Sequence, residues 1–434
     1  MINKKKILLL SSGDTFGAYE FIYRMAKFME EDYVVAMVVR DKRKREPWLS
    51  QLKANIPKKK FSKRLINLLK RKVGIKIESF STDPKYVFLP SENECIQLVS
   101  AESILQQISF VPDVIISGMT DGFLNTTTLF NLHKKTGAQV YQVMVDMNVI
   151  TGGCHYLRGC EEFKCSCSNC PAITNQRYKK FTSTNFAIKK RNIEQGNFKL
   201  LAVPGLTIHQ ANSSVLYKDR TKIMTSSVID TDVFTNINRS IAKQVFCIPT
   251  DARVIFAGSL IANCEIKGRK YLIEALSEVW NCADENMREK TVVLLAGHNN
   301  KEDEQTKKIQ FKKILIEYIT DYRLLSLLYQ ASDIFVCPSL EDGGPMMVTE
   351  ALSCGTPVVG FETGVLFDNT LVQNGINGYH VKMKDSSELA RAVGEILSLN
   401  QSKFNEMSNN ARESGIINAS KEAYLLSIKE FLYE

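Results

Sequence analysis

Short, continuous apolar runs recur along both halves of the chain, and they restrict the fold more than any other feature of the sequence. The runs occupy residues 6–13, 112–117, 138–145, 199–203, 252–258, 291–297, 334–337 and 357–360. Such runs are typical of strands buried on both faces of a parallel sheet. Helical periodicity separates them, as over residues 18–29. The alternation predicts an α/β fold with doubly wound, Rossmann-like sheets.

The length of the chain and a restart of this pattern predict two domains. A chain of 434 residues exceeds the usual size of one hydrophobic core. The strand and helix pattern begins again after residues 229–234. We therefore expect an N-terminal domain over residues 1–228 and a C-terminal domain over 229–415, which face each other across a cleft. We expect a C-terminal helix over 416–434 to pack back on the first domain.

The segment from Pro338 to Val359 indicates a phosphate-binding turn. It reads as a strand end, a glycine turn, a helix, a glycine cap and a strand; Pro345 suits the first helical turn, and Gly355 suits the position after the last. Such a junction directs backbone N–H groups and the positive end of the helix outward, and this can hold a pyrophosphate without a metal ion.

Two acidic residues in this segment are candidate ligands of a sugar nucleotide. Asp342 lies in the expected loop, and Glu350 stands eight positions later, within the expected helix. Both carboxylates can accept hydrogen bonds from sugar and ribose hydroxyls. As isolated residues they would better suit a capping acid and a solvated helix glutamate.

With these residues the chain resembles glycosyltransferase family 4, which comprises retaining enzymes of the GT-B fold. The family's hallmark of two acids is matched by Asp342, Glu350, Ala351, Gly355, Thr356 and Pro357. Residues 229–234 at the hinge, Lys267-Gly268 before a helix and residues 377–379 extend the resemblance. It implies the GT-B architecture, a nucleotide-diphosphate sugar as donor and no catalytic metal.

The resemblance also implies roles for the donor-side residues. Glu350 would hold the nucleotide ribose, Asp342 the donor sugar, and Lys267 the departing diphosphate, while the Gly343-Gly344 turn would bind sugar or phosphate through its amides. A fixed lysine stabilises the charge that develops on the diphosphate more in the transition state than in the ground state. Lys267 and Asp342 are therefore predicted catalytic residues.

Two further glycines and two departures from the family pattern concern the donor. Gly13 and Gly17, in the first strand-to-helix loop, would let the helix approach the donor phosphate, although such a pair alone indicates only an ordinary turn. Asp342 stands where the family usually has Glu. Ile261 stands where it usually has a basic residue.

The candidate acceptor side is the segment after the run 138–145. Asp146 follows a parallel strand, at the end where α/β sheets place their ligands. Relatives that share the Thr151–Tyr156 sequence Thr-Gly-Gly-Cys-His-Tyr carry His-Asp where this chain has Val145-Asp146. Asp146, which we also count as catalytic, and His155 are therefore expected to contact the acceptor.

Four cysteines in the same region form a candidate structural metal site. Cys154, Cys160, Cys167 and Cys170 have the spacing C-x5-C-x6-C-x2-C, and four thiolates can close tetrahedrally on Zn²⁺. Four sulfur ligands leave no open position for catalysis. The alternatives are reduced cysteines or disulfides.

A basic segment indicates an anionic partner. Residues 42–76 carry fourteen Lys or Arg and one acid, and residues 61–72 combine an apolar face with cations. This pattern predicts an interfacial helix on an anionic membrane surface; the alternative is a packed helix with a solvated basic rim. No apolar run is long enough to span a bilayer, and the start of the chain lacks a signal-peptide pattern. We expect a cytoplasmic protein, docked peripherally on the inner face of the membrane.

Together these features predict a retaining glycosyltransferase that acts on a hydroxyl of a lipid-linked or polysaccharide acceptor in cell-surface glycan biosynthesis. One alternative is a GT-B-like sugar-nucleotide epimerase. Another is a zinc-containing nucleic-acid-binding protein, but the cations are concentrated in one segment without interleaved stacking aromatics, and two α/β domains would be unexplained. We therefore expect no nucleic-acid partner.

Overall fold

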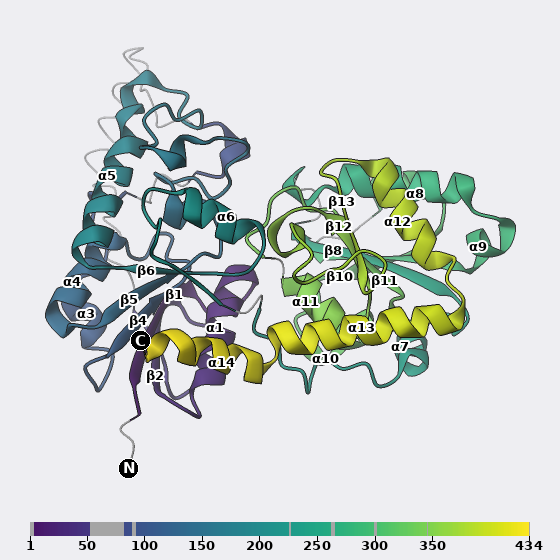
Figure 1. The fold of residues 1–434 in the computed structure, drawn as a ribbon, viewed down its shortest axis with the longest axis horizontal. Helices are drawn as coiled ribbons and strands as arrows, with labels where there is room; N and C mark the ends of the chain where they lie inside the picture. Colours follow the sequence, from purple (N-terminus) through teal and green to yellow (C-terminus); the bar gives the residue numbers. More distant parts are fainter. Residues whose placement is uncertain are drawn as a thin grey trace, which may run out of the picture. The chain divides into compact units, whose positions relative to one another are not determined.

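The computed structural model describes residues 4–52, 82–88, 93–224, 227–261, 265–298, 302–344 and 346–433. The chain divides into two compact units (Figure 1). The first comprises Met1–Ala202 and Ile208–Ile223, and the second Val203–Thr207 and Met224–Glu434. Each unit holds one parallel sheet with helices on its faces, so the predicted α/β fold with two Rossmann-like sheets is confirmed.

The first unit contains a seven-stranded sheet with the order β3-β2-β1-β4-β5-β6-β7. Its strands are β1 (Lys6–Gly13), β2 (Val34–Asp41), β3 (Leu49–Gln51), β4 (Val114–Ser117), β5 (Gln139–Val143), β6 (Lys199–Ala202) and β7 (Thr221–Ile223). Every neighbouring pair is parallel. The direction of winding reverses between β1 and β4, which makes the carboxyl ends of these strands the expected ligand position.

Helices and short 3-10 turns connect the strands of this unit. They are α1 (Gly17–Met29), η1 (Pro84–Tyr86), α3 (Ala101–Leu105), α4 (Thr126–Thr136), η2 (Met147–Ile150), η3 (Glu162–Lys164), η4 (Gln176–Tyr178), α5 (Lys180–Gln195) and α6 (Leu206–Ser213). Local sequence sets the ends of α4: the Asn125 side chain accepts a hydrogen bond from the Thr128 amide, and Gly137 closes the helix in the left-handed conformation.

The second unit contains a six-stranded sheet with the order β10-β9-β8-β11-β12-β13. Its strands are β8 (Arg253–Ile261), β9 (Thr291–His298), β10 (Lys312–Glu317), β11 (Ile334–Cys337), β12 (Val358–Phe361) and β13 (Gly378–Val381). All neighbouring pairs are parallel. Its switch point lies between β8 and β11.

The helices and 3-10 turns of the second unit follow the same alternation. They are α7 (Arg239–Val245), η5 (Glu265–Lys267), α8 (Arg269–Cys282), α9 (Glu285–Lys290), η6 (Thr306–Lys308), α10 (Tyr322–Ala331), α11 (Met346–Ser353), η7 (Gly364–Leu366), α12 (Ser386–Leu397), α13 (Gln401–Ala419) and α14 (Lys421–Leu432). The terminal segment is thus formed by the end of α13 and by α14, both within the second unit. Its packing on the first domain stays a prediction.

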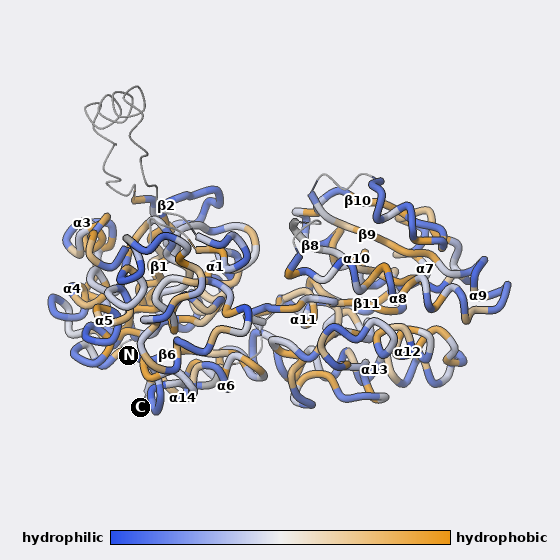
Figure 2. The backbone as a smooth tube through the Cα atoms, turned by 90° about the horizontal axis from the view of Figure 1, so that it is seen from above, coloured by the Kyte–Doolittle hydropathy of each residue, from blue (hydrophilic) through white to orange (hydrophobic). Residues whose placement is uncertain are grey.

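Apolar residues concentrate along the strands. In Figure 2, β9 is coloured mainly hydrophobic, whereas α9, in which no residue is buried, is mainly hydrophilic. Four consecutive residues of β11 are fully covered, as expected for a strand with helices on both faces.

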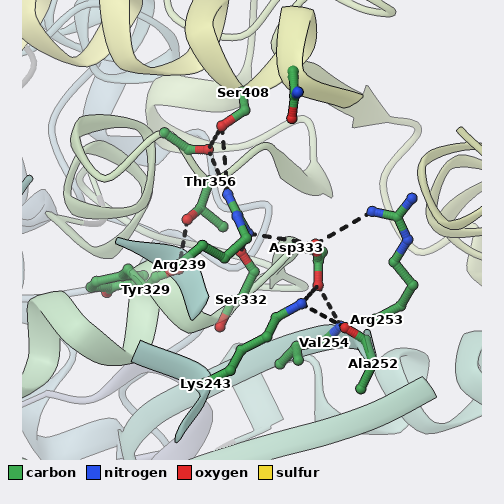
Figure 3. A network of polar contacts seen from close by, with 12 residues as sticks. Arg239, Lys243, Ala252, Arg253, Val254, Tyr329, Ser332, Asp333, Thr356 and Ser408 are labelled. Carbon is green, nitrogen blue, oxygen red and sulfur yellow. Dashed lines mark hydrogen bonds and ion pairs between the residues drawn. The ribbon is translucent and has the colours of Figure 1, made fainter. Parts of the chain in front are cut away.

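A cluster of charges connects α7 to the sheet of the second unit. Figure 3 shows three cations directed at one carboxylate, that of Asp333. Lys243 Nζ lies 3.2 Å from Asp333 Oδ2, and Arg239 and Arg253 each place Nη1 3.5 Å from Oδ1. The carboxylate also accepts a hydrogen bond of 2.8 Å from the Val254 amide. Burial lowers the pKa of Lys243, and the neighbouring Asp333 opposes that shift.

The predicted interfacial helix over residues 61–72 lies outside the described residues, so the membrane hypothesis stays a prediction. Across the parts of the chain that the structure describes, every helix is too short or too polar to cross a bilayer.

Candidate functional site

A glycine brings the segments after β8 and β11 into direct contact at the switch point of the second sheet. Gly268 has φ +65°, and a Cβ atom there would lie 1.7 Å from the carbonyl oxygen of Pro338. The Leu340 amide donates a 2.7 Å hydrogen bond to the Ile266 carbonyl. Only glycine allows so close an approach. The approach fixes the position of Lys267, the residue before it.

Lys267 and Asp342 form an ion pair at this point. Lys267 Nζ lies 2.7 Å from Asp342 Oδ2, and the two side chains are 30% and 16% exposed. The Gly344 amide donates to the other oxygen of Asp342 at 3.3 Å. Gly344 has φ +132°, which favours glycine. The structure therefore brings together Lys267, Asp342 and the Gly343-Gly344 turn, and their roles toward a donor stay predictions.

The pKa of the buried Cys337 thiol, at the end of β11, depends on both members of the ion pair. Burial raises the pKa of Cys337 to about 11; the charge of Asp342 adds to this shift and Lys267 opposes it. The thiol is consequently neutral at pH 7. Because Lys267 and Asp342 remain partly exposed, a charged ligand can reach them and replace one member of the ion pair.

Glu350 lies on α11 and is 3% exposed, so the alternative of a solvated helix glutamate is wrong. Its Oε2 accepts a hydrogen bond of 3.1 Å from the hydroxyl of Tyr329 on α10. Burial raises the pKa of Tyr329, and the charge of Glu350 adds to the shift. Sequence reasoning missed Tyr329, because a tyrosine on an amphipathic helix is typical of an ordinary core residue.

The glycine cap of α11 is confirmed. Gly355 has φ +67°, its amide donates to the Leu352 carbonyl, and the Thr356 amide donates to the Ala351 carbonyl. The start of α11 is not described in full, because Pro345 lies outside the described residues.

In the first unit, the predicted glycine loop links β1 to α1. Gly13 ends β1, and Gly17 begins α1 with φ +47°. The carboxylate of Asp14, fully buried between them, accepts hydrogen bonds of 2.8 Å from the amides of Arg43 and Lys44. These contacts tie the loop to the chain after β2. The proposed approach of Gly13 and Gly17 to a donor stays a prediction.

The predicted acceptor residues Asp146 and His155 are in direct contact. Asp146 follows β5, and its Oδ2 lies 2.6 Å from His155 Nδ1. Its Oδ1 accepts a hydrogen bond of 2.8 Å from the Asn148 amide. Both residues line a cavity of about 50 Å³ in the first unit, together with Glu94 and Lys189.

Glu94 and Lys189 are buried charges that sequence reasoning missed. Burial raises the pKa of Glu94, and Lys189 opposes the shift. Glu94 Oε2 accepts from the amide and hydroxyl of Thr126 at 3.0 and 2.6 Å. Lys189 Nζ donates to the carbonyls of Asn148 and Thr151 at 2.6 and 3.0 Å. The cavity therefore combines polar groups with apolar walls, and the polar groups suit a ligand with hydroxyl groups.

The two glycines of the Thr151–Tyr156 sequence are required by packing. A Cβ atom at Gly152 would lie 2.4 Å from the Thr182 carbonyl oxygen. One at Gly153, where φ is +140°, would lie 2.5 Å from the ring of Phe88. The close packing fixes the backbone that presents Cys154 and His155.

The four predicted metal-ligating cysteines line one cavity of about 10 Å³. They are free thiols. Within the described residues, however, no three His, Cys, Asp or Glu side chains are already arranged around one point as a metal site. The fifth cysteine, Cys165, is exposed.

Part of the chain matches a known family. Residues 251–399, which include Lys267, Asp342 and Glu350, match the family described as Glycosyl transferases group 1. D-inositol 3-phosphate glycosyltransferase from Mycolicibacterium smegmatis is 28% identical over 181 residues, which are 39% of this chain and 38% of that protein. UDP-Gal:alpha-D-GlcNAc-diphosphoundecaprenol alpha-1,3-galactosyltransferase from Escherichia coli is 32% identical over 85 residues, 20% of this chain and 21% of that protein. The chain thus spans well under half the length of these relatives.

Solved structures resemble the whole chain. Sucrose-phosphate synthase from Thermosynechococcus elongatus has a TM-score of 0.64 and 14% identity, over 99% of this chain and 98% of that one. HepE from Anabaena, in complex with UDP-glucose, has a TM-score of 0.62 and 16% identity, over 99% of each chain. These likenesses show that the chain has the GT-B fold.

Proposed function

We propose that this chain is a glycosyltransferase that moves a sugar from a nucleotide-diphosphate sugar to a hydroxyl group. The observation that carries the proposal is the contact between Lys267 and Asp342 at the switch point of the second sheet, followed along the chain by the buried Glu350 on α11. All three residues lie in the segment that matches the glycosyltransferase family. This is the position where open α/β sheets bind nucleotides.

The ion pair between Lys267 and Asp342 suits a donor whose leaving group carries more negative charge than the Asp342 carboxylate that it would replace. A diphosphate would compete with Asp342 for the ammonium group of Lys267, and Asp342 would then accept hydrogen bonds from the donor sugar. As the anomeric C–O bond breaks, negative charge grows on the diphosphate. A lysine held by Gly268 needs little reorganisation to stabilise that charge. Glu350, on α11, would bind the ribose.

We extend the proposal to retention of the anomeric configuration, on the resemblance of residues 342–357 to the family 4 motif. The test is proton NMR of the first transfer product. The proposal expects the donor and the product to have the same anomeric configuration. An inverted product would refute the extension while leaving the transferase proposal in place.

For the acceptor, we propose the polar cavity of the first unit, with Asp146 and His155 contacting the attacking hydroxyl. The E. coli relative carries the name of an enzyme for a diphosphoundecaprenol acceptor. This supports a lipid-linked or polysaccharide acceptor and a place at the cytoplasmic face of a membrane. Asp146→Asn should slow transfer while the donor still binds.

The decisive experiment is calorimetric titration of the purified chain with UDP-, GDP-, dTDP- and ADP-sugars. UDP-glucose comes first, because the similar HepE structure contains it. We expect one donor class to bind, and Glu350→Gln and Lys267→Ala to weaken it at least tenfold. Glu406→Gln, an exposed glutamate on α13, is the matched control and should bind as the wild type does.

Two results would redirect the proposal. If no sugar nucleotide binds to the folded chain, the transferase proposal fails. If the bound donor is converted to an isomeric sugar nucleotide without an acceptor, the chain is an epimerase instead.

A further inference from the structure

The segment between β5 and α5, residues 144–179, has almost no regular structure of its own. It contains the short turns η2, η3 and η4, and two isolated bridges join it to residues 82 and 88. Six residues of the segment pack into the main core of the first unit, namely Met144, Met147, Ile150, Leu157, Phe163 and Cys167. The rest of it shares with residues 82–88 a smaller buried cluster of Tyr86, Phe88, Cys154, Cys170, Ala172 and Ile173. Irregular segments of this length inside a compact unit are uncommon. The part that carries Cys154 and Cys170 depends on the smaller cluster, so a further constraint there would stabilise it.

The cysteine cavity offers such a constraint. Four cysteines reach it from separate points of the segment, and the remaining walls are mainly apolar. Its volume of about 10 Å³ is close to that of a single water-sized sphere. An organic ligand is therefore excluded, whereas a single ion fits.

The backbone directs N–H groups at the sulfur atoms. The Gly152 amide donates to Cys167 Sγ at 3.3 Å, and the Glu162 amide donates to the sulfur of Cys160. Cys167 itself has φ +52°, a left-handed conformation that is unfavourable for a residue with a side chain. A tight turn that presents a sulfur to the cavity thus persists at an energetic cost.

Backbone N–H groups are also directed at the sulfur of Cys170. Its sulfur accepts hydrogen bonds from the amides of Ala172 and Ile173 and contacts the thiol of Cys154. Repeated N–H donors around sulfur are what metal-bound thiolates require, because each sulfur keeps negative charge after binding.

We propose that Cys154, Cys160, Cys167 and Cys170 together bind one Zn²⁺ ion, which shapes residues 144–179. The four thiols would lose their protons to solvent as four Zn–S bonds form, and the contact between Cys154 and Cys170 would be replaced by bonds to the ion. The sulfurs are not yet in ligand geometry. Binding would require the four side chains that line this cavity to reorient toward one point.

The ion would also support the candidate acceptor cavity. Cys154 is adjacent in sequence to His155, and Gly152 joins the same backbone to Cys167. Fixing this stretch holds the ring of His155 against Asp146. This second consequence rests on the proposed function, whereas zinc binding itself does not.

The test is the metal content of the full chain, purified without chelators and measured by mass spectrometry of the elements. We expect one zinc per chain in the wild type and a loss of at least five-fold in Cys170→Ser. Cys165→Ser, an exposed cysteine of the same segment, is the matched control and should keep one zinc per chain. A wild type that stays free of zinc after incubation with Zn²⁺, or a Cys170→Ser protein with undiminished zinc, would overturn the proposal.

A second measurement covers the case in which Cys170→Ser does not fold. Zinc is released from the wild type with a thiol-binding mercurial, which is then removed, and Co²⁺ is added. The sulfur-to-cobalt charge-transfer bands of a tetrahedral thiolate site are expected, and their absence would contradict the proposal. Titration with UDP-glucose in parallel separates the two proposals, because a chain that binds the sugar nucleotide but no metal refutes only the zinc site.

Discussion

Substitution of Gly268 by alanine should damage both the stability of the second unit and the donor site. The new Cβ atom would lie 1.7 Å from the carbonyl oxygen of Pro338, and the residue would have to keep φ at +65°. The left-handed conformation costs about 1–2 kcal/mol for alanine, and overpacking of a fixed backbone costs about 1–3 kcal/mol. The sum is roughly 3 kcal/mol, which lowers the Tm of a unit of this size by about 10 °C.

The same clash should weaken catalysis beyond the loss of stability. To relieve it, the segment that carries Lys267 must move away from the segment that carries Asp342 by roughly 1 Å or more. A displacement of that size near the reacting groups costs about a hundredfold in rate. We expect kcat to fall by this factor at a temperature where the variant is still folded.

The assay pairs thermal unfolding, followed by circular dichroism, with donor titration and turnover. Gly394→Ala is the matched control: Gly394 lies within α12, and a Cβ atom there would meet nothing within 4 Å. Alanine should stabilise that helix by about 0.5–1 kcal/mol, so the two substitutions are expected to shift the Tm in opposite directions. If Gly268→Ala unfolds at the wild-type temperature and binds the donor unchanged, the close contact does not position Lys267.

Three further predictions concern buried polar groups. Asp333→Asn should destabilise the second unit by about 3–5 kcal/mol in urea denaturation, because three cations lose their shared carboxylate. Asp251→Asn, at an exposed ion pair, is the control and should change the stability little. Equal losses of stability in the two variants would refute the argument. Glu94 has a folded-state pKa raised above 4.5 by burial, so its stabilising contribution is complete below pH 4.5 and is lost as the pH rises through the folded-state value. Glu94→Gln should therefore flatten the decline of stability above pH 4.5, and an unchanged pH profile would show that this carboxyl is not responsible. Tyr329→Phe removes a donor to the buried carboxylate of Glu350 and should cost about 1–3 kcal/mol; a smaller loss in thermal unfolding would mean that other donors suffice.

Most interior strands could be predicted because burial on both faces leaves a direct record in the sequence, whereas the edge strands β3, β7, β10 and β13 lay outside the predicted runs. Residues 334–337 are apolar without interruption, and β11 has these bounds. Gly355 could be predicted for a similar reason, since the end of a helix places a local demand on φ. The requirement for Gly268 could not be predicted in this way, because it arises from contact with Pro338, far away in the sequence. Local patterns do not encode such contacts.

The same difference between local patterns and distant contacts applies to the residues of the candidate site. Lys267 and Asp342 were predicted from motif positions, and the structure places them in contact. Glu94 and Lys189 were missed, because charged residues are mostly exposed and a sequence does not reveal the few that folding buries. Their burial depends on neighbours contributed by other elements of the first unit.

The ion pair between Lys267 and Asp342 has a consequence for turnover. Asp342 competes with any ligand for Lys267. Because Asp342 belongs to the same chain, its effective concentration at Lys267 does not depend on the concentration of ligand in solution. Under the proposed function, the diphosphate of an arriving donor would have to displace this carboxylate, which would lower the affinity for the donor. When the nucleoside diphosphate product leaves, the same carboxylate would pair with the ammonium group again and favour that departure. The ion pair would thus weaken donor binding and speed the release of product.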